Sequence, residues 1–148
     1  MRAEDLLREP ERLERKIRIL AREIDRIRLG LLPGGVDYTL DRVDGGGGSD
    51  RYPAALDRIL PREEKIRELN ARRLWLIEVR IPWLLSQLRD DLDRDIIQAY
   101  YCEGRNTLEQ VAEIVHASRR TVQRHRDAGL EQIQKIIDEE EKLTNYAH

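Results

Sequence analysis

Apolar residues recur through the N-terminal part of the chain at alternating spacings of four and three. They are Leu13, Ile17, Leu20, Ile24 and Ile27, with Leu31 just beyond. This spacing puts the apolar side chains on one face of a helix and matches the heptad pattern of a coiled coil. The pattern predicts a long helix from about Pro10 to Leu29, with the proline in its first turn, where a missing N–H costs little.

The helical pattern stops between Gly30 and Pro53, a stretch that holds seven of the nine glycines. Glycine adds flexibility and has no side chain to bury, so residues 30–53 are predicted to form a flexible loop. The glycine run at 45–48 continues as Ser49-Asp50-Arg51 and lacks the Lys and Ser/Thr of a P-loop. A nucleotide site is therefore not expected there.

A second apolar stripe predicts another long helical region from about Ala54 to Leu88. We expect Pro61 to reset the start of this helix and Pro82 to kink or break it, because proline removes a backbone donor. Two arrangements stay open for the N-terminal region. The two helices can pair with each other as an antiparallel hairpin, or the first can form a coiled coil with its copy in another subunit.

The C-terminal third predicts three further helices. The first runs from Leu92 to about Cys102 and ends at Gly104, a common helix stop. Thr107, followed three residues later by Gln110, is a capping-box pattern that opens the second helix. Ser118 is a good N-cap for the third helix.

The spacing of three residues predicts that the last two helices form a helix-turn-helix. Ala112 is small enough to let the helix backbones approach, and Val122 can fill the gap between them. His116 lies at the turn, which needs a left-handed backbone; glycine is usual there, and histidine adopts positive φ more readily than most residues.

The third helix of this group carries a dense positive face. The chain of 148 residues has a net charge of −2, so any attraction to nucleic acid must be local. Between Ser118 and Arg126 there are four arginines and no acid, a local charge of +4. The acids just upstream, Asp90, Asp91, Asp93 and Asp95, are expected to face away from DNA, where they could meet a basic protein partner.

These residues predict a surface that binds double-stranded DNA. Arg119, Arg120 and Arg124 can form paired hydrogen bonds with guanine, and Gln123 can do so with adenine. Thr121 and Arg126 are expected to contact the DNA backbone. Ser118, at the start of the helix, completes the predicted DNA-binding set, and the helix N-terminus adds partial positive charge.

Three motifs in this region resemble region 4 of bacterial sigma factors: residues 95–101 with Gly104, residues 107–112, and residues 118–122. The wider layout resembles phage and prophage regulators of the ArpU and RinA type, with a coiled helix, a glycine-rich loop containing Asp41-Arg42-Val43 and a second long helix. The resemblance implies that the C-terminal domain binds promoter DNA and activates late phage genes. His116 departs from the usual glycine.

The residues that catalysis or metal binding would need are sparse. The single cysteine, Cys102, excludes an internal disulfide and is expected to be a buried helix residue. His116, His125 and His148 are too scattered in sequence for a metal site, and no catalytic triad can be assigned. We expect no enzyme activity, cofactor or metal. Without a signal peptide or an apolar membrane span, a cytoplasmic protein is expected.

The sequence thus predicts an all-α protein with a helical region at 1–88 and a helix-turn-helix domain at 89–148. A homodimer is favoured because helix-turn-helix proteins commonly bind paired half-sites. The expected function is sequence-specific regulation of transcription, with RNA polymerase as a further partner. Two alternatives stay open: a small terminase subunit that acts in phage DNA packaging, and a module that contacts RNA polymerase and barely touches DNA.

Overall fold

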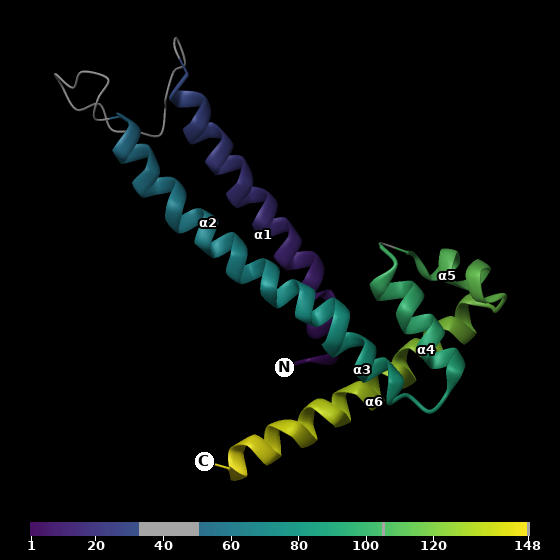
Figure 1. The fold of residues 1–148 in the computed structure, drawn as a ribbon. Coiled ribbons are helices and arrows are strands. Elements are labelled where there is room, and N and C mark those ends of the chain that lie inside the picture. Colours follow the sequence, from purple (N-terminus) through teal and green to yellow (C-terminus); the bar gives the residue numbers. More distant parts are fainter. Residues whose placement is uncertain (33–50, 105, 148) are drawn as a thin grey trace. The chain divides into compact units, whose positions relative to one another are not determined.

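A computed structural model describes residues 1–32, 51–104 and 106–147 (Figure 1). Within these ranges all regular secondary structure is helical, which confirms the all-α prediction. The elements are α1 (Ala3–Gly30), α2 (Arg51–Trp75), η1 (Leu76–Arg80), α3 (Ile81–Ser86), α4 (Asp91–Ile97), η2 (Gln98–Cys102), α5 (Leu108–Val115) and α6 (Arg119–Tyr146). The elements η1 and η2 are single turns of π-helix. Most of the predicted glycine-rich loop, residues 33–50 with Asp41-Arg42-Val43, lies outside the described residues.

The chain divides by its contacts into two compact units. One is a hairpin unit, Glu11–Leu74, and the other combines Met1–Pro10 with Trp75–His148. The predicted boundary between residues 88 and 89 falls inside the second unit. One reason is that the Arg94 side chain donates hydrogen bonds to the carbonyls of Leu85 and Leu88, which ties α4 to the end of α3.

In the hairpin unit, α1 from Glu11 onward and α2 run side by side in opposite directions (Figure 1). Its buried core consists of Ile24, Ile27, Ala55 and Ile59. At one end, the Arg51 side chain donates a hydrogen bond to the Gly30 carbonyl at 2.6 Å. Ile24 and Ile27 of the heptad stripe therefore pack against the second helix of the same chain, as in the first of the two arrangements left open by the sequence.

Pro10 and Pro61 differ from their predicted roles, whereas Pro82 interrupts the regular helix as expected. Because α1 begins at Ala3, Pro10 lies inside the helix and not in its first turn. Pro61 lies inside α2, which continues through it. At Pro82 the regular α-helix does change: the π-helical turn η1 precedes it, and Pro82 stands in the first turn of α3, where its missing N–H breaks no bond within that helix.

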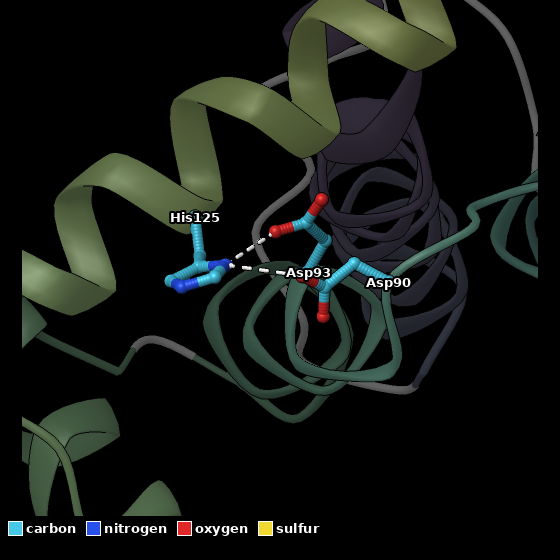
Figure 2. A group of neighbouring side chains, drawn as sticks. All are labelled: Asp90, Asp93 and His125. Carbon is cyan, nitrogen blue, oxygen red and sulfur yellow. Dashed lines mark hydrogen bonds and ion pairs between the residues drawn. The ribbon is translucent and has the colours of Figure 1, made fainter.

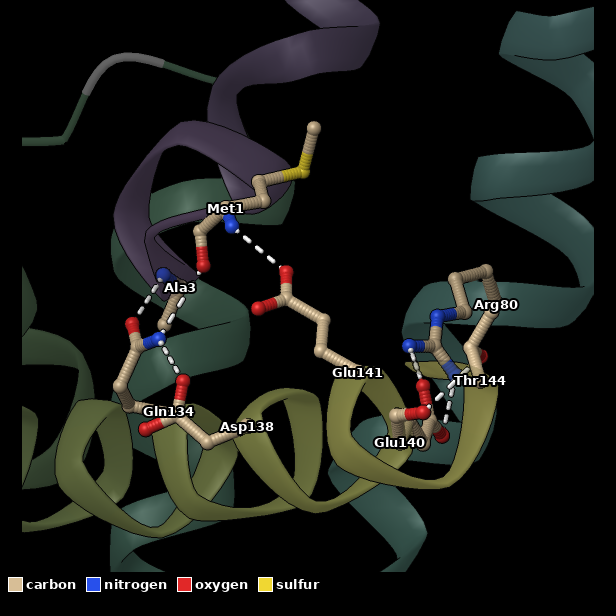
Figure 3. Close-up of polar contacts among 8 residues, drawn as sticks. All are labelled: Met1, Ala3, Arg80, Gln134, Asp138, Glu140, Glu141 and Thr144. Carbon is tan, nitrogen blue, oxygen red and sulfur yellow. Dashed lines mark hydrogen bonds and ion pairs between the residues drawn. The ribbon is translucent and has the colours of Figure 1, made fainter. Parts of the chain in front are cut away.

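In the second unit, α4, η2, α5 and the start of α6 surround one core of buried apolar side chains: Ile96, Ala99, Val111 and Val122. Farther along α6, Ile133 and Ile137 are buried as well. The N-terminal segment bonds to this part of α6, since Gln134 accepts a hydrogen bond from the Ala3 amide at 2.7 Å (Figure 3). The long helix α6 is thus held by the unit along much of its length.

Candidate nucleic-acid interface

Side-chain caps begin both α5 and α6 where the sequence predicted them. Thr107 accepts a hydrogen bond from the Gln110 amide at 3.2 Å, and the Gln110 side chain accepts one from the Thr107 amide at 2.7 Å. This reciprocal pair is a complete capping box. Ser118 accepts a hydrogen bond from the Thr121 amide at 3.1 Å, which caps the start of α6.

A tight turn joins α5 to α6, and its geometry confirms the spacing argument. His116 ends α5 with φ 54° and ψ 45°, the left-handed conformation that this position was expected to need. The Ala117 amide donates to the Ala112 carbonyl at 3.0 Å and closes the turn. Val122 is fully buried, and Ala112 packs beside it against the same core. Since Val122 points inward, the opposite face of the first turns of α6 is left to solvent.

Five of the seven predicted contact residues are exposed on that outer face: Ser118, Arg119, Arg120, Gln123 and Arg124. In the part of the chain that the structure describes, the side chains of Arg120, Gln123 and Arg124 have no hydrogen bond or ion pair with another residue. Thr121 is partly buried, and its hydroxyl accepts a hydrogen bond from Ser118 at 2.9 Å. The turn therefore presents to solvent two arginines and a glutamine that have no side-chain partner among the described residues.

Arg119 has a partner within the chain. Its Nε lies 3.2 Å from an oxygen of Glu109, in the first turn of α5, and both side chains are more than half exposed. An ion pair so open to water stabilises a protein by little and can be exchanged for another partner. Glu109 is a residue of this surface that sequence reasoning missed. Its position after the Thr107 cap indicated only that an acid suits a helix N-terminus.

Arg126 is not free in the way that Arg120 and Arg124 are. Its guanidinium lies 5.1 Å from the centre of the Tyr100 ring in a cation–π contact, and its side chain is only 20% exposed. The guanidinium also lies 3.4 Å from Asp127. The expected backbone contact by Arg126 stays a prediction, but the structure places this arginine against η2 of its own unit.

Asp93 is a buried carboxylate beneath α6, which the sequence did not indicate. It accepts a hydrogen bond from His125 Nδ1 at 2.6 Å (Figure 2), and another from Gln132 Nε2 at 3.0 Å. The residue is 3% exposed. Asp93 is therefore not available to the basic protein partner that the sequence allowed for it. Its partners lie 32 and 39 positions away in the chain, and such a contact has no local sequence signal.

Asp90 joins Asp93 and His125 in a group whose possible metal-ligand atoms all lie within 4.8 Å of one another (Figure 2). Three ligands of this kind could in principle hold a divalent cation. However, Asp93 already uses both oxygens for bonds to α6, and Asp90 accepts from the Leu92 amide as the cap of α4. These hydrogen bonds account for the group without an ion. Sequence reasoning considered the histidines and missed the carboxylates beside His125.

Cys102 corrects another expectation. It is exposed at the end of η2, whereas its place in a predicted helix indicated a buried residue. Asp95 and Gln98, seven and four residues earlier on the same side of the helix, are exposed as well, so Cys102 continues an outward-facing row. Ala99, three residues earlier, takes a buried position instead.

Comparisons with known proteins found no match for this chain among protein-family models, curated proteins or solved structures. Among the helices of the described ranges, none combines the length and apolar character needed to cross a membrane.

Proposed function

We propose that the protein binds double-stranded DNA through the first turns of α6 and regulates transcription by recognising a specific sequence. One observation carries the proposal. Arg120, Gln123 and Arg124 stand exposed, with no partner among the described residues, at the start of a helix that a tight turn presents to solvent. A helix of this kind fits the major groove of B-DNA, which is wide enough to admit it.

Each side chain has a chemical role in this proposal. Arg120 and Arg124 carry guanidinium groups that can donate two parallel hydrogen bonds to guanine O6 and N7, and the Gln123 amide can pair with adenine N6 and N7. Arg119 can reach a base or a phosphate once it leaves Glu109. Ser118 and Thr121 lie at the helix N-terminus, where backbone N–H groups and the helix dipole favour a phosphate.

The wider assignment is part of the same proposal. The resemblance to sigma region 4 and to ArpU- and RinA-type regulators supports a role in activating late phage or prophage genes. Binding as a homodimer would place two α6 helices on paired half-sites, and RNA polymerase would be a partner at the promoter.

The experiment compares the wild-type protein with R120A and R124A on fragments selected from a random DNA pool. If either arginine reads a base, its loss should cost about 1–3 kcal/mol on the selected sequence and much less on unrelated DNA. Arg22 is also exposed and without a partner among the described residues, so R22A is the matched control and should bind as the wild type does.

Salt dependence and oligomeric state separate the alternatives. Affinity should fall steeply as salt increases, because phosphate contacts release counterions. A wild-type protein without salt-dependent DNA binding would contradict the proposal, and polymerase capture by that protein would then favour an interaction module. A ring-sized oligomer in light scattering would favour the small terminase subunit over the dimeric regulator.

A further inference from the structure

The contact between α4 and α6 is built around one buried charge. Asp93 is the only buried polar or charged residue among those that the structure describes. Burying a carboxylate is costly unless it is paired and hydrogen-bonded. Here both oxygens are bonded, one to His125 and one to Gln132. Both donors belong to α6, whereas Asp93 belongs to α4. The carboxylate therefore links the two helices.

The face of α6 that meets Asp93 consists of His125, Gly129 and Gln132. His125 and Gln132 are seven residues apart, two helical turns, and therefore lie on the same side of the helix. Between them, a Cβ built on Gly129 would approach Ile97 Cγ1 to 2.9 Å, closer than real Cβ atoms come. The absence of a side chain at Gly129 lets α4 lie directly against the α6 backbone. Asp93 is bonded by His125 before this glycine and by Gln132 after it.

This arrangement controls the rotation of α6 about its own axis. Each helical residue advances by about 100°, so holding His125 in place also sets the direction of its neighbours Gln123 and Arg124. Val122 contributes apolar packing, which is non-directional. The 2.6 Å bond from His125 to Asp93 adds a directional constraint within the same turns as the exposed face.

We propose that Asp93 is a positioning residue that sets the angle at which α6 presents Gln123 and Arg124, and so controls discrimination between DNA sequences. This inference rests on the proposed function. Paired hydrogen bonds to a base edge need accurate placement of the helix, whereas a long arginine side chain can follow a phosphate through a small rotation. Loss of the Asp93 contact should therefore weaken binding to the selected sequence more than binding to unrelated DNA.

The test uses the full chain, at a temperature where circular dichroism shows every variant fully folded, and measures Kd on selected and on unrelated DNA. D93N preserves the shape of the side chain but removes its charge. We expect the ratio of the two affinities to fall about tenfold, the size of one lost base contact. Asp95 is exposed on the same helix, so D95N makes the same change of charge and should leave the ratio unchanged.

Two further variants separate positioning from stability. In a Q123A/R124A background, D93N should change the ratio by clearly less than in the wild type, because two of the side chains that it orients are gone. H125A should lower the affinity ratio as D93N does. H125N should keep the ratio close to the wild-type value, since the asparagine amide can donate a hydrogen bond as His125 Nδ1 does. The histidine variants test the same contact if D93N does not fold.

The outcomes distinguish this inference from the function on which it rests. If the wild type binds DNA but D93N and H125A lower only the melting temperature and leave the affinity ratio unchanged, Asp93 stabilises the fold and the positioning role is overturned. If the wild-type protein itself shows no salt-dependent DNA binding, the proposed function fails first, and it takes the positioning role with it.

Discussion

The two halves of α6 are both rich in charged and polar residues, yet the structure uses them differently. In the first half, Arg120 and Arg124 are exposed and have no partner among the described residues. In the second half, Glu140 and Glu141 are bound within the chain, as is Gln134 (Figure 3). A charged helix face therefore indicates a binding surface only where the structure leaves its charges unpaired.

The second half of α6 is held by contacts from two directions. Arg80 forms a two-pronged ion pair with Glu140, with Nη1 and Oε1 3.0 Å apart, and its guanidinium also lies over the Trp83 ring. Glu141 accepts a hydrogen bond from the Met1 amino group at 2.8 Å, which raises the pKa of that group (Figure 3). These contacts make the second half a structural support for the first.

The largest expected effect comes from the buried face of the second half. Ile133 is fully buried, so I133A should lower the free energy of unfolding by about 2–5 kcal/mol through lost burial and a residual cavity. Urea unfolding of the wild type and I133A measures this difference in the free energy of unfolding. Leu143 is 70% exposed on the same helix, and L143A should change stability by no more than about 0.5 kcal/mol. Equal losses of unfolding free energy in I133A and L143A would show that the buried face of the second half does not stabilise the protein.

The next largest effect is a difference in stability between the variants of two arginines in the first half of α6, Arg126 and Arg124. R126A removes the cation–π contact with Tyr100 and should destabilise the protein by about 0.5–2 kcal/mol. R124A removes an exposed side chain that has no hydrogen bond, ion pair or ring contact with the described residues, and should change stability by less than about 0.5 kcal/mol. Thermal unfolding checks both. Comparable destabilisation by R124A would show that this arginine is also bound within the fold.

A smaller effect depends on pH. The hydrogen bond from Arg80 lowers the pKa of Glu140 below its usual 4.5. A lowered folded-state pKa gives stability that is present above the ordinary value and is lost as the pH falls through the lowered one. For this partly exposed ion pair we expect a stabilisation of the folded state of about 0.2–1 kcal/mol. The stability difference between wild type and E140Q should thus be present at about pH 6 and vanish towards about pH 3.

The control for this pH effect is E139Q. Glu139 is exposed and has no partner among the described residues, so E139Q should match the wild type at both pH values in urea unfolding. A difference between wild type and E140Q that stays constant with pH would rule out the ion pair with Arg80 as its source.

The smallest effect concerns Arg119, an outer-face arginine whose partner is Glu109. E109Q should free Arg119 and strengthen DNA binding by up to about 1 kcal/mol, the upper range for an exposed ion pair. Glu113 is exposed on the same helix, so E113Q controls for the loss of one negative charge. In a double-mutant cycle, R119A should be coupled to E109Q and not to E113Q. Absence of coupling would show that the two side chains act independently.

Local sequence patterns were enough to predict the framework of the candidate interface. The Thr107 capping box, the Ser118 cap and the left-handed His116 all depend on residues within a few positions of one another. Backbone preference and short-range hydrogen bonds specify such features wherever the segment lies. The inward direction of Val122 follows from helical periodicity in the same way.

Tertiary structure decided which charged residues are available. Nothing near Asp93 in sequence indicated that it would be buried against His125, and nothing near Arg126 indicated Tyr100 as its partner. The attachment of residues 1–10 to α6 joins positions more than a hundred residues apart. A charge can be satisfied by water, by a distant side chain or by another molecule, and the packing of distant segments selects among these.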